Sequence, residues 1–435
     1  MVHTMSRGLS VGRAALLVVG GFGFGALQAA KSGAEGAPEL AVTVPERDLG
    51  PLGESADPRE REPERERDPD REDEADQAGE LVGDGELRGV LALASMFEDE
   101  GELIAPLVGG GEAVLTLEPE AQDAAERVLE RANPEVGAIV AMSMEGDILA
   151  YAGRRNIDPA REQDWQLPAQ VWAPAASVFK VVTAGALVSA GVEPSREVCF
   201  HGGGRSIESE HLQDHPLDHR CEDLAFGVSH SGNAVMAKLA HRHLDATTLS
   251  DYAGRFGFYE APDFAIEADA GRARIPEEPL EFARVAAGFW HTEISALGGA
   301  TLAGVVASGG LKVAPRIVDR VVEPSGHIRE VVPEEPERTL DPHVASHVGD
   351  MMVGTTVSGT ARRAFSARQY LPGIRVAGKT GTLTRRDPSH IGYSWFVGFA
   401  PADDPEVAIA VVLGNPPAWT LRGHTAARMV LQSLL

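Results

Sequence analysis

The feature that most constrains the fold is the separation of apolar, strand-like segments into an early and a late group. The early group, residues 137–153, is typical of two strands around a Glu-Gly-Asp turn, and the late group covers residues 374–384, 393–401 and 407–414. The chain between the groups is mainly helical in pattern. A sheet that joins both groups must carry these helices as an insertion, so the sequence predicts an α+β fold: an antiparallel sheet flanked by helices, with an all-helical subdomain.

One predicted helix, residues 176–190, is apolar on nearly every side yet contains a single lysine, Lys180. Pro174 precedes the helix and Gly191 ends it. Because a buried, unpaired ammonium is very costly, a lysine that reaches solvent is the simplest interpretation. Positions i and i+3 share a helix face, however, so Ser177 and Lys180 can also meet. A lysine kept neutral by burial or by a second cation would then take the serine proton and make the serine a nucleophile.

Two later motifs supply the second cation and the polar edge that a serine–lysine pair requires. They are the S-G-N segment Ser231–Asn233 and the K-T-G-T segment Lys379–Thr382. Taken alone, the first is explained by capping of the predicted helix 234–243, and the second by a strand end with a solvated lysine. A glycine inside a strand, here Gly381, also marks the close approach of another backbone, such as a peptide substrate added to the sheet edge.

The combination of S-x-x-K, S-x-N and K-T-G is far more specific than any single motif, and it resembles the transpeptidase domain of penicillin-binding proteins. Four further segments are similar to that family: residues 115–129, 137–153, 302–318 and 393–416. The resemblance covers residues 112–435 and implies the family's transpeptidase fold in a monofunctional, class B-like form. Neither a glycosyltransferase domain nor the usual N-terminal pedestal domain is expected before residue 112.

The resemblance implies a role for each motif residue. Ser177 attacks the carbonyl between two D-alanines and forms an acyl-enzyme, while Lys180 takes its proton. Ser231 relays a proton to the leaving amine, and Asn233 holds Lys180 and the substrate amide. Lys379 helps to keep Lys180 neutral and attracts the substrate's terminal carboxylate.

The remaining roles concern substrate binding. The threonines on either side of Gly381, Thr380 and Thr382, hydrogen-bond the substrate carboxylate. Backbone N–H groups of Ser177 and Thr382 form the oxyanion hole, where one donor is typically worth about 3 kcal/mol. The resemblance requires no metal and no organic cofactor.

The implied activity is that of a serine D,D-transpeptidase, which cross-links peptidoglycan stem peptides and binds penicillin and other β-lactam antibiotics covalently. The alternatives are a D,D-carboxypeptidase or a serine β-lactamase of the same fold, although no E-x-x-x-N loop of the class A β-lactamase type follows the S-G-N segment. A non-catalytic sensor of β-lactams or peptidoglycan is the alternative from another functional class. Other cell-wall synthesis proteins are possible partners.

The N-terminal part of the chain predicts export and a tether. The chain has 435 residues and a formal net charge of −26, which argues against a nucleic-acid partner. Basic residues and an apolar run within residues 1–31 fit a signal peptide or a membrane anchor, so we expect a periplasmic protein of the bacterial envelope, held at the inner membrane or released by cleavage. We expect a disordered charged linker over 32–80, a short connecting segment over 81–111 and the transpeptidase domain over 112–435.

The two cysteines, Cys199 and Cys221, lie in one loop-like region. In an exported chain such a pair favours a disulfide. Four histidines in the same region keep a Cys/His zinc site open, and free thiols are the third alternative: His201, His211, His215 and His219. Spacing alone does not decide among them.

Overall fold

The computed structural model describes residues 82–156, 163–367, 369–384, 391–415 and 420–435, all within one compact unit, Asp68–Leu435. Its main sheet has five antiparallel strands in the order β15-β16-β17-β4-β5. The strands are β4 (Val136–Ser143), β5 (Ile148–Arg155), β15 (Ala377–Thr384), β16 (Gly392–Ala400) and β17 (Val407–Asn415). The early hairpin therefore pairs with the late strands through β4 and β17, as the sequence predicts, and β15 is left at an edge.

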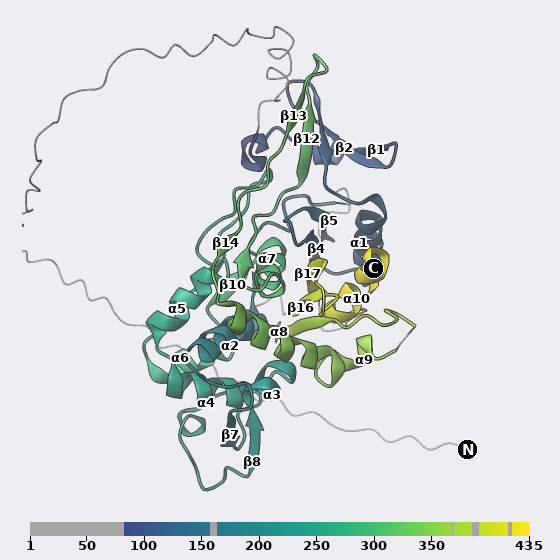
Figure 1. Ribbon diagram of the computed structural model, residues 1–435. Helices are drawn as coiled ribbons and strands as arrows, with labels where there is room; N and C mark the ends of the chain where they lie inside the picture. Colours follow the sequence, from purple (N-terminus) through teal and green to yellow (C-terminus); the bar gives the residue numbers. More distant parts are fainter. Residues whose placement is uncertain (1–81, 157–162, 368, 385–390, 416–419) are drawn as a thin grey trace, which may run out of the picture. The chain divides into compact units, whose positions relative to one another are not determined.

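Helices cover both faces of this sheet (Figure 1). On one face lie α1 (Pro119–Ala132) and α10 (Gly423–Leu434), and on the other α7 (Ala296–Ala307) and α8 (Pro342–Val357). The short helix α9 (Arg362–Phe365) follows α8. Because side chains alternate along a strand, Ile139 packs with α1 and α10 whereas its neighbour Val140 belongs to the core on the α7 side. The sheet is thus buried on both faces, which explains its nearly continuous apolar strands.

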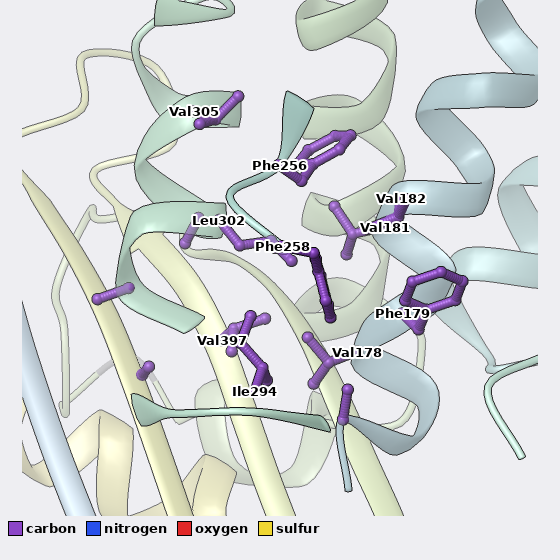
Figure 2. Packing of buried hydrophobic residues seen from close by; sticks show 14 of the residues in the cluster. Val178, Phe179, Val181, Val182, Phe256, Phe258, Ile294, Leu302, Val305 and Val397 are labelled. Atoms are coloured by element: carbon purple, nitrogen blue, oxygen red, sulfur yellow. The ribbon is translucent and has the colours of Figure 1, made fainter. Parts of the chain in front are cut away.

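The helical subdomain is inserted between β5 and β15. It contains α2 (Lys180–Ser189), α3 (Leu224–Ser229), α4 (Asn233–His243), α5 (Ala246–Arg255) and α6 (Pro279–Ala286). Figure 2 shows how the start of α2 is fixed in the core: the ring of Phe179 lies edge-on to that of Phe258, with 5.5 Å between ring centroids. Both rings are fully buried, and burial of each contributes about 1.5–3 kcal/mol. The turn before α2 therefore has a rigid base.

A second five-stranded sheet has the strand order β1-β2-β3-β12-β13 and shares no strand with the main sheet. Its strands are β1 (Phe97–Asp99), β2 (Glu102–Pro106), β3 (Glu112–Leu115), β12 (Val318–Val322) and β13 (Ile328–Glu330). The segment 81–111, expected to be a short connecting segment, thus supplies two strands and two 3-10 turns, Asp84–Leu87 and Leu93–Ser95. The strands are short, and β1 is fully exposed, so the apolar pattern did not indicate them.

Three small ribbons complete the described strands. They are β6 (Ala173–Pro174) with β10 (Thr292–Ile294) and β9 (Arg272–Ala273), β7 (Glu197–Phe200) with β8 (Arg220–Asp223), and β11 (Leu311–Lys312) with β14 (Glu337–Arg338). The predicted α+β class and the antiparallel sheet flanked by helices are confirmed, and the inserted subdomain is mainly helical but also carries the β7–β8 ribbon between α2 and α3. The predicted leader and linker, residues 1–80, lie outside the described residues. Among the residues that the structure describes, no helix is long and apolar enough to cross a membrane.

Candidate active site

A strained turn presents Ser177 at the start of the subdomain. Ser177 lies in the 3-10 helix Ala176–Phe179, and α2 follows directly at Lys180. Ala176 has a φ of 50°, in the left-handed region that non-glycine residues seldom occupy. Gly288 packs so closely behind the turn that a Cβ there would lie 2.4 Å from the Ala176 carbonyl oxygen. The backbone around the serine is therefore held by packing in a conformation that costs free energy.

Lys180 is fully buried and points back at the serine, so it does not reach solvent. Its Nζ lies 2.7 Å from Ser177 Oγ, 2.8 Å from Asn233 Oδ1 and 2.6 Å from the Ala287 carbonyl oxygen. Burial, and then the positive charge of Lys379, hold the pKa of Lys180 well below its ordinary value. The neutral amine can donate to both oxygen acceptors and keep its lone pair for the serine hydroxyl.

The S-G-N motif forms the turn into α4. Ser231 has a φ of 58°, and the helix cap is Gly232, so neither polar residue of the motif serves as the N-cap. Asn233 begins α4, and its Nδ2 donates to the Gly204 carbonyl oxygen at 2.8 Å while its Oδ1 accepts from Lys180. The side-chain amide is thus oriented from both ends.

The K-T-G-T motif lies on the edge strand β15. Lys379 is fully buried, and its Nζ donates to the Thr380 carbonyl oxygen at 2.9 Å. Burial lowers the pKa of Lys379 to about 7. At Gly381 a Cβ would come within 3.0 Å of Trp395 Cβ and 3.3 Å of Val178 Cγ2, so the glycine lets the strand lie against the serine turn.

These elements surround a cavity of about 380 Å³. Five motif residues line it: Ser177, Ser231, Asn233, Thr380 and Thr382. The two lysines lie behind this wall, since both are fully buried. The arrangement joins a serine hydroxyl, a neutral amine and an edge strand able to pair with a peptide, which together suit acyl transfer through a serine ester.

Five further lining residues were not predicted from the sequence: Thr360, Ser394, Trp395, Arg422 and His424. Thr360 Oγ1 lies 2.6 Å from Thr380 Oγ1, and Trp395 Nε1 donates to the Pro174 carbonyl oxygen at 2.9 Å. Burial, and then the charge of Arg422, lower the pKa of His424 to about 4. The one available signal was the Arg-Gly-His sequence at the start of the last helix, where a polar triplet precedes an amphipathic segment.

Cys199 and Cys221 face each other across the β7–β8 ribbon and form a disulfide. Lys238 of α4 is fully buried beneath the ribbon. Its Nζ donates to the Cys199 carbonyl oxygen at 2.8 Å and to Asp218 Oδ2 at 2.6 Å. Because both sulfurs are joined to each other, neither cysteine is a free thiol or a thiolate ligand in this structure.

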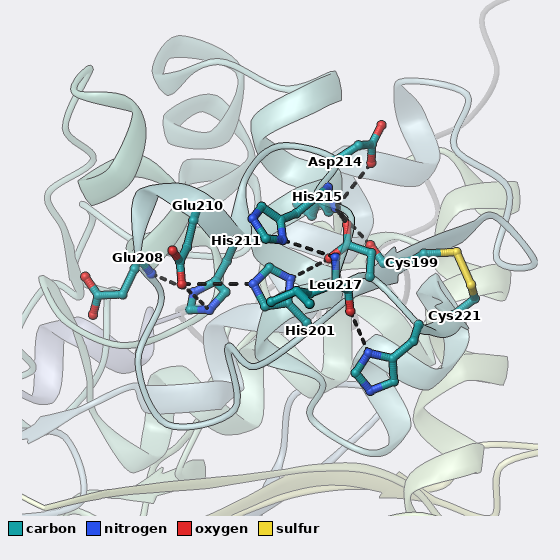
Figure 3. A network of polar contacts seen from close by, with 12 residues as sticks. Cys199, His201, Glu208, Glu210, His211, Asp214, His215, Leu217 and Cys221 are labelled. Carbon is teal, nitrogen blue, oxygen red and sulfur yellow. Dashed lines mark hydrogen bonds and ion pairs between the residues drawn. A yellow bond between two sulfur atoms is a disulfide. The ribbon is translucent and has the colours of Figure 1, made fainter.

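Three histidines of the same loop lie close together (Figure 3): the ring centroid of His201 is 5.3 Å from that of His211 and 4.6 Å from that of His215. His201 Nε2, Glu210 Oε1 and His211 Nε2 lie within 4.8 Å of one another, a set that could suit a cation. His201 Nδ1 lies 2.6 Å from Asp218 Oδ1, which leaves its Nε2 lone pair free. His211 Nδ1, however, accepts the Glu208 N–H at 2.9 Å, so a neutral His211 carries its hydrogen at Nε2. In this hydrogen-bonding state His211 offers no lone pair toward the other two atoms, and the cluster is better described as an anchor for the loop.

Known proteins of similar sequence include a peptidoglycan D,D-transpeptidase and a sporulation protein. The chain is 26% identical over 340 residues to the peptidoglycan D,D-transpeptidase PbpA of Mycobacterium tuberculosis. The matched region covers 70% of this chain and 68% of PbpA. The chain is 25% identical over 360 residues to stage V sporulation protein D of Bacillus subtilis, covering 78% of this chain and 55% of that protein.

Solved structures show the same fold. The crystal structure of penicillin-binding protein A from M. tuberculosis matches with a TM-score of 0.62 at 22% identity, over 76% of this chain and 81% of the other. The D,D-transpeptidase domain of a peptidoglycan glycosyltransferase from Eggerthella lenta matches with a TM-score of 0.60 at 26% identity, over 74% and 82%. The family model described as penicillin binding protein transpeptidase domain matches residues 137–434, which include all three motifs. The chain therefore belongs to the penicillin-binding protein transpeptidase family.

Proposed function

We propose that this protein is a serine D,D-transpeptidase that cross-links peptidoglycan stem peptides ending in D-Ala-D-Ala. The observation that carries the proposal is the 2.7 Å contact between Ser177 Oγ and the Nζ atom of the fully buried Lys180. A neutral amine at that distance accepts the serine proton as the hydroxyl attacks a carbonyl, which an ammonium ion cannot do.

The reaction has two half-reactions. Ser177 Oγ bonds to the carbonyl carbon between the two D-alanines, its proton passes to Lys180 Nζ, and the C–N bond breaks. The terminal D-alanine leaves with a proton delivered through Ser231. The amine of an acceptor strand then attacks the ester, forms the new amide and returns the proton to the serine oxygen. A β-lactam undergoes the first half-reaction alone, because ring opening leaves the amine tethered in the site.

The other motif residues bind and orient the substrate in this proposal. Asn233 holds Lys180 and the peptide amide, and Lys379 keeps the Lys180 amine neutral. Thr380 and Thr382 donate hydrogen bonds to the terminal carboxylate. The backbone N–H groups of Ser177 and Thr382 stabilise the tetrahedral oxyanion, with one donor worth about 3 kcal/mol.

The proposed reaction belongs in the bacterial envelope. We propose a periplasmic location, with the basic and apolar segment 1–31 holding the protein at the inner membrane near other cell-wall synthesis proteins. Membrane fractionation of the full chain and of a variant lacking residues 1–31 tests this: the full chain should sediment with membranes and the truncated one should not. A full-length chain found wholly in the soluble fraction, with its first residues removed, would favour cleaved export.

The test of the nucleophile is covalent labelling with a fluorescent penicillin. Wild type should be labelled, Ser177→Ala should not, and Ser189→Ala at the exposed end of the same helix should behave as wild type. Labelling of folded Ser177→Ala at the normal rate would contradict the assignment.

The test of the reaction uses a stem pentapeptide and an amine acceptor. Mass spectrometry should detect a new amide product that depends on Ser177. Release of D-alanine with no amide product at any acceptor concentration would identify a carboxypeptidase, and rapid hydrolysis of bound penicillin a β-lactamase.

A further inference from the structure

The start of helix α10 forms part of the cavity wall next to the threonines of β15. The Gly423 N–H donates to Ser394 Oγ at 3.0 Å, and Ser394 lies directly opposite Thr382 in the β15–β16 ladder. A Cβ on Gly423 would lie 2.7 Å from the Ser394 carbonyl oxygen, so the helix start is pressed against β16. Arg422, the residue just before α10, is thereby fixed one strand away from Thr382, and both residues line the same cavity.

Arg422 is the one permanently charged side chain that lines this cavity in the described part of the chain. No acidic residue lines it, and the described residues offer the Arg422 guanidinium no hydrogen-bond or ion-pair partner. Its neighbour His424 stays neutral at physiological pH, because burial and the Arg422 charge lower its pKa to about 4. An exposed guanidinium on the wall of a polar cavity that holds no carboxylate is free to bind an anion supplied from outside.

The K-T-G lysine is poorly placed to supply that charge. Lys379 is fully buried behind the cavity wall, and its Nζ is already engaged with the Thr380 carbonyl oxygen. Its pKa of about 7 also leaves it only partly protonated near neutral pH. Any positive charge offered directly at the surface of the cavity therefore comes from Arg422.

We propose that Arg422 binds the terminal carboxylate of the substrate, and the equivalent carboxylate of a penicillin, together with the hydroxyl groups of Thr380 and Thr382. This inference rests on the proposed acyl-transfer function and adds a residue that determines specificity. Arg422 selects substrates with a free carboxylate over their amides and esters, because only the anion gains charge-assisted hydrogen bonds with the guanidinium.

The experiment compares benzylpenicillin with its methyl ester, which keeps the β-lactam ring but lacks the negative charge. Second-order acylation rates are measured by intact-protein mass spectrometry for wild type, Arg422→Gln, Arg422→Lys and Arg274→Gln. Arg274→Gln is the matched control, since Arg274 lines a separate hollow of about 350 Å³ beside Leu383. The acid-to-ester rate ratio cancels effects that both compounds share.

We expect Arg422→Gln to lower the acid-to-ester ratio about 10- to 100-fold, the range for loss of a hydrogen bond to a charged group. Arg422→Lys should lower it less, because the charge remains but the two-pronged geometry is lost. Arg274→Gln should leave the ratio unchanged. The ester should acylate wild type and Arg422→Gln at rates within about 3-fold of each other, since the ester makes no charge-assisted contact.

An unchanged ratio in both Arg422 variants would overturn the inference while leaving Ser177 acylation intact. Failure of both compounds to acylate wild type would instead contradict the proposed function itself. The side chain of Arg422 makes no helix-capping hydrogen bond, so folding of the Gln variant is expected and is checked by thermal unfolding. If that variant is unfolded, the ratio in Arg422→Lys decides: a value equal to wild type refutes the role of the guanidinium geometry.

Discussion

Replacement of Lys379 by methionine should stabilise the protein in a strongly pH-dependent way. Lys379 is fully buried, and burial lowers its pKa from 10.5 to about 7. At about 1.4 kcal/mol per pH unit, that difference corresponds to a cost on the order of 5 kcal/mol at pH values below about 7. Methionine has a similar length and no charge, so Lys379→Met removes this cost.

The sign of the pH dependence follows from proton binding. Between about pH 7 and 10.5 the unfolded chain keeps the lysine proton while the folded protein has lost it, so wild-type stability rises with pH in this window. The advantage of Lys379→Met is therefore largest below about pH 7 and disappears toward pH 10.5. Loss of the hydrogen bond to the Thr380 carbonyl oxygen subtracts about 1 kcal/mol at every pH.

The assay is urea unfolding of wild type and variant near pH 6.5 and pH 9.5. We expect a gain on the order of 4 kcal/mol at the lower pH and less than about 1 kcal/mol at the higher pH. Lys312→Met is the matched control, because Lys312 is partly exposed and pairs with Glu337 at 2.8 Å. That substitution should change stability by less than about 1 kcal/mol at both pH values. A gain for Lys379→Met that is equal at both pH values, or a net loss at pH 6.5, would refute the assignment of Lys379 as a buried, destabilising ammonium.

The remaining predictions concern the catalytic amine, the histidine of the cavity and the disulfide. The acylation rate should fall as pH drops, because Lys180 then gains a proton. Lys180→Arg should be nearly inactive, since arginine stays protonated, while Lys379→Arg should keep more activity. Acylation rates of both variants across a pH series test this, and the reverse order of activities would contradict the roles given to the two lysines. The acidic limb of that profile should survive His424→Gln, because the pKa of His424 is already about 4; a limb that vanishes would make the imidazole the titrating group. Replacement of both Cys199 and Cys221 by serine should lower the free energy of unfolding by about 3 kcal/mol, because the disulfide closes a loop with a sequence separation of 22. Urea unfolding measures this change, and unchanged stability would show that the loop keeps its structure without the disulfide.

Sequence reasoning succeeded where the chemistry depends on local spacing. The Ser177–Lys180 contact follows from i,i+3 geometry on a helical turn, and the main sheet follows from strand-like segments whose apolar residues fill both faces. The motif residues at Asn233 and Thr380 line the same cavity as Ser177, as the resemblance implied. Their catalytic roles stay a prediction that the labelling experiment tests.

Sequence reasoning failed where a contact is made by a backbone carbonyl or by a residue without a motif. Lys180 donates to Ala287 and Asn233 donates to Gly204, and a carbonyl oxygen has no signature in the sequence. Arg422 was missed because an arginine ahead of an amphipathic helix is normally a solvated residue. Only the pressing of Gly423 against β16 brings it to the cavity.

The loop between Cys199 and Cys221 influences the active site because its Gly204 carbonyl oxygen orients the Asn233 side-chain amide. An asparagine side chain can present either its oxygen or its NH₂ group to a neighbour, and only the oxygen accepts from Lys180. The Gly204 carbonyl oxygen selects that orientation, because it can only accept and therefore binds Nδ2. Gly204 belongs to the loop that Asp218 fastens, through its contacts with His201 and with the buried Lys238. The polar anchor and the disulfide thus lie outside the cavity yet restrict the loop whose carbonyl sets the hydrogen-bond pattern around the catalytic amine.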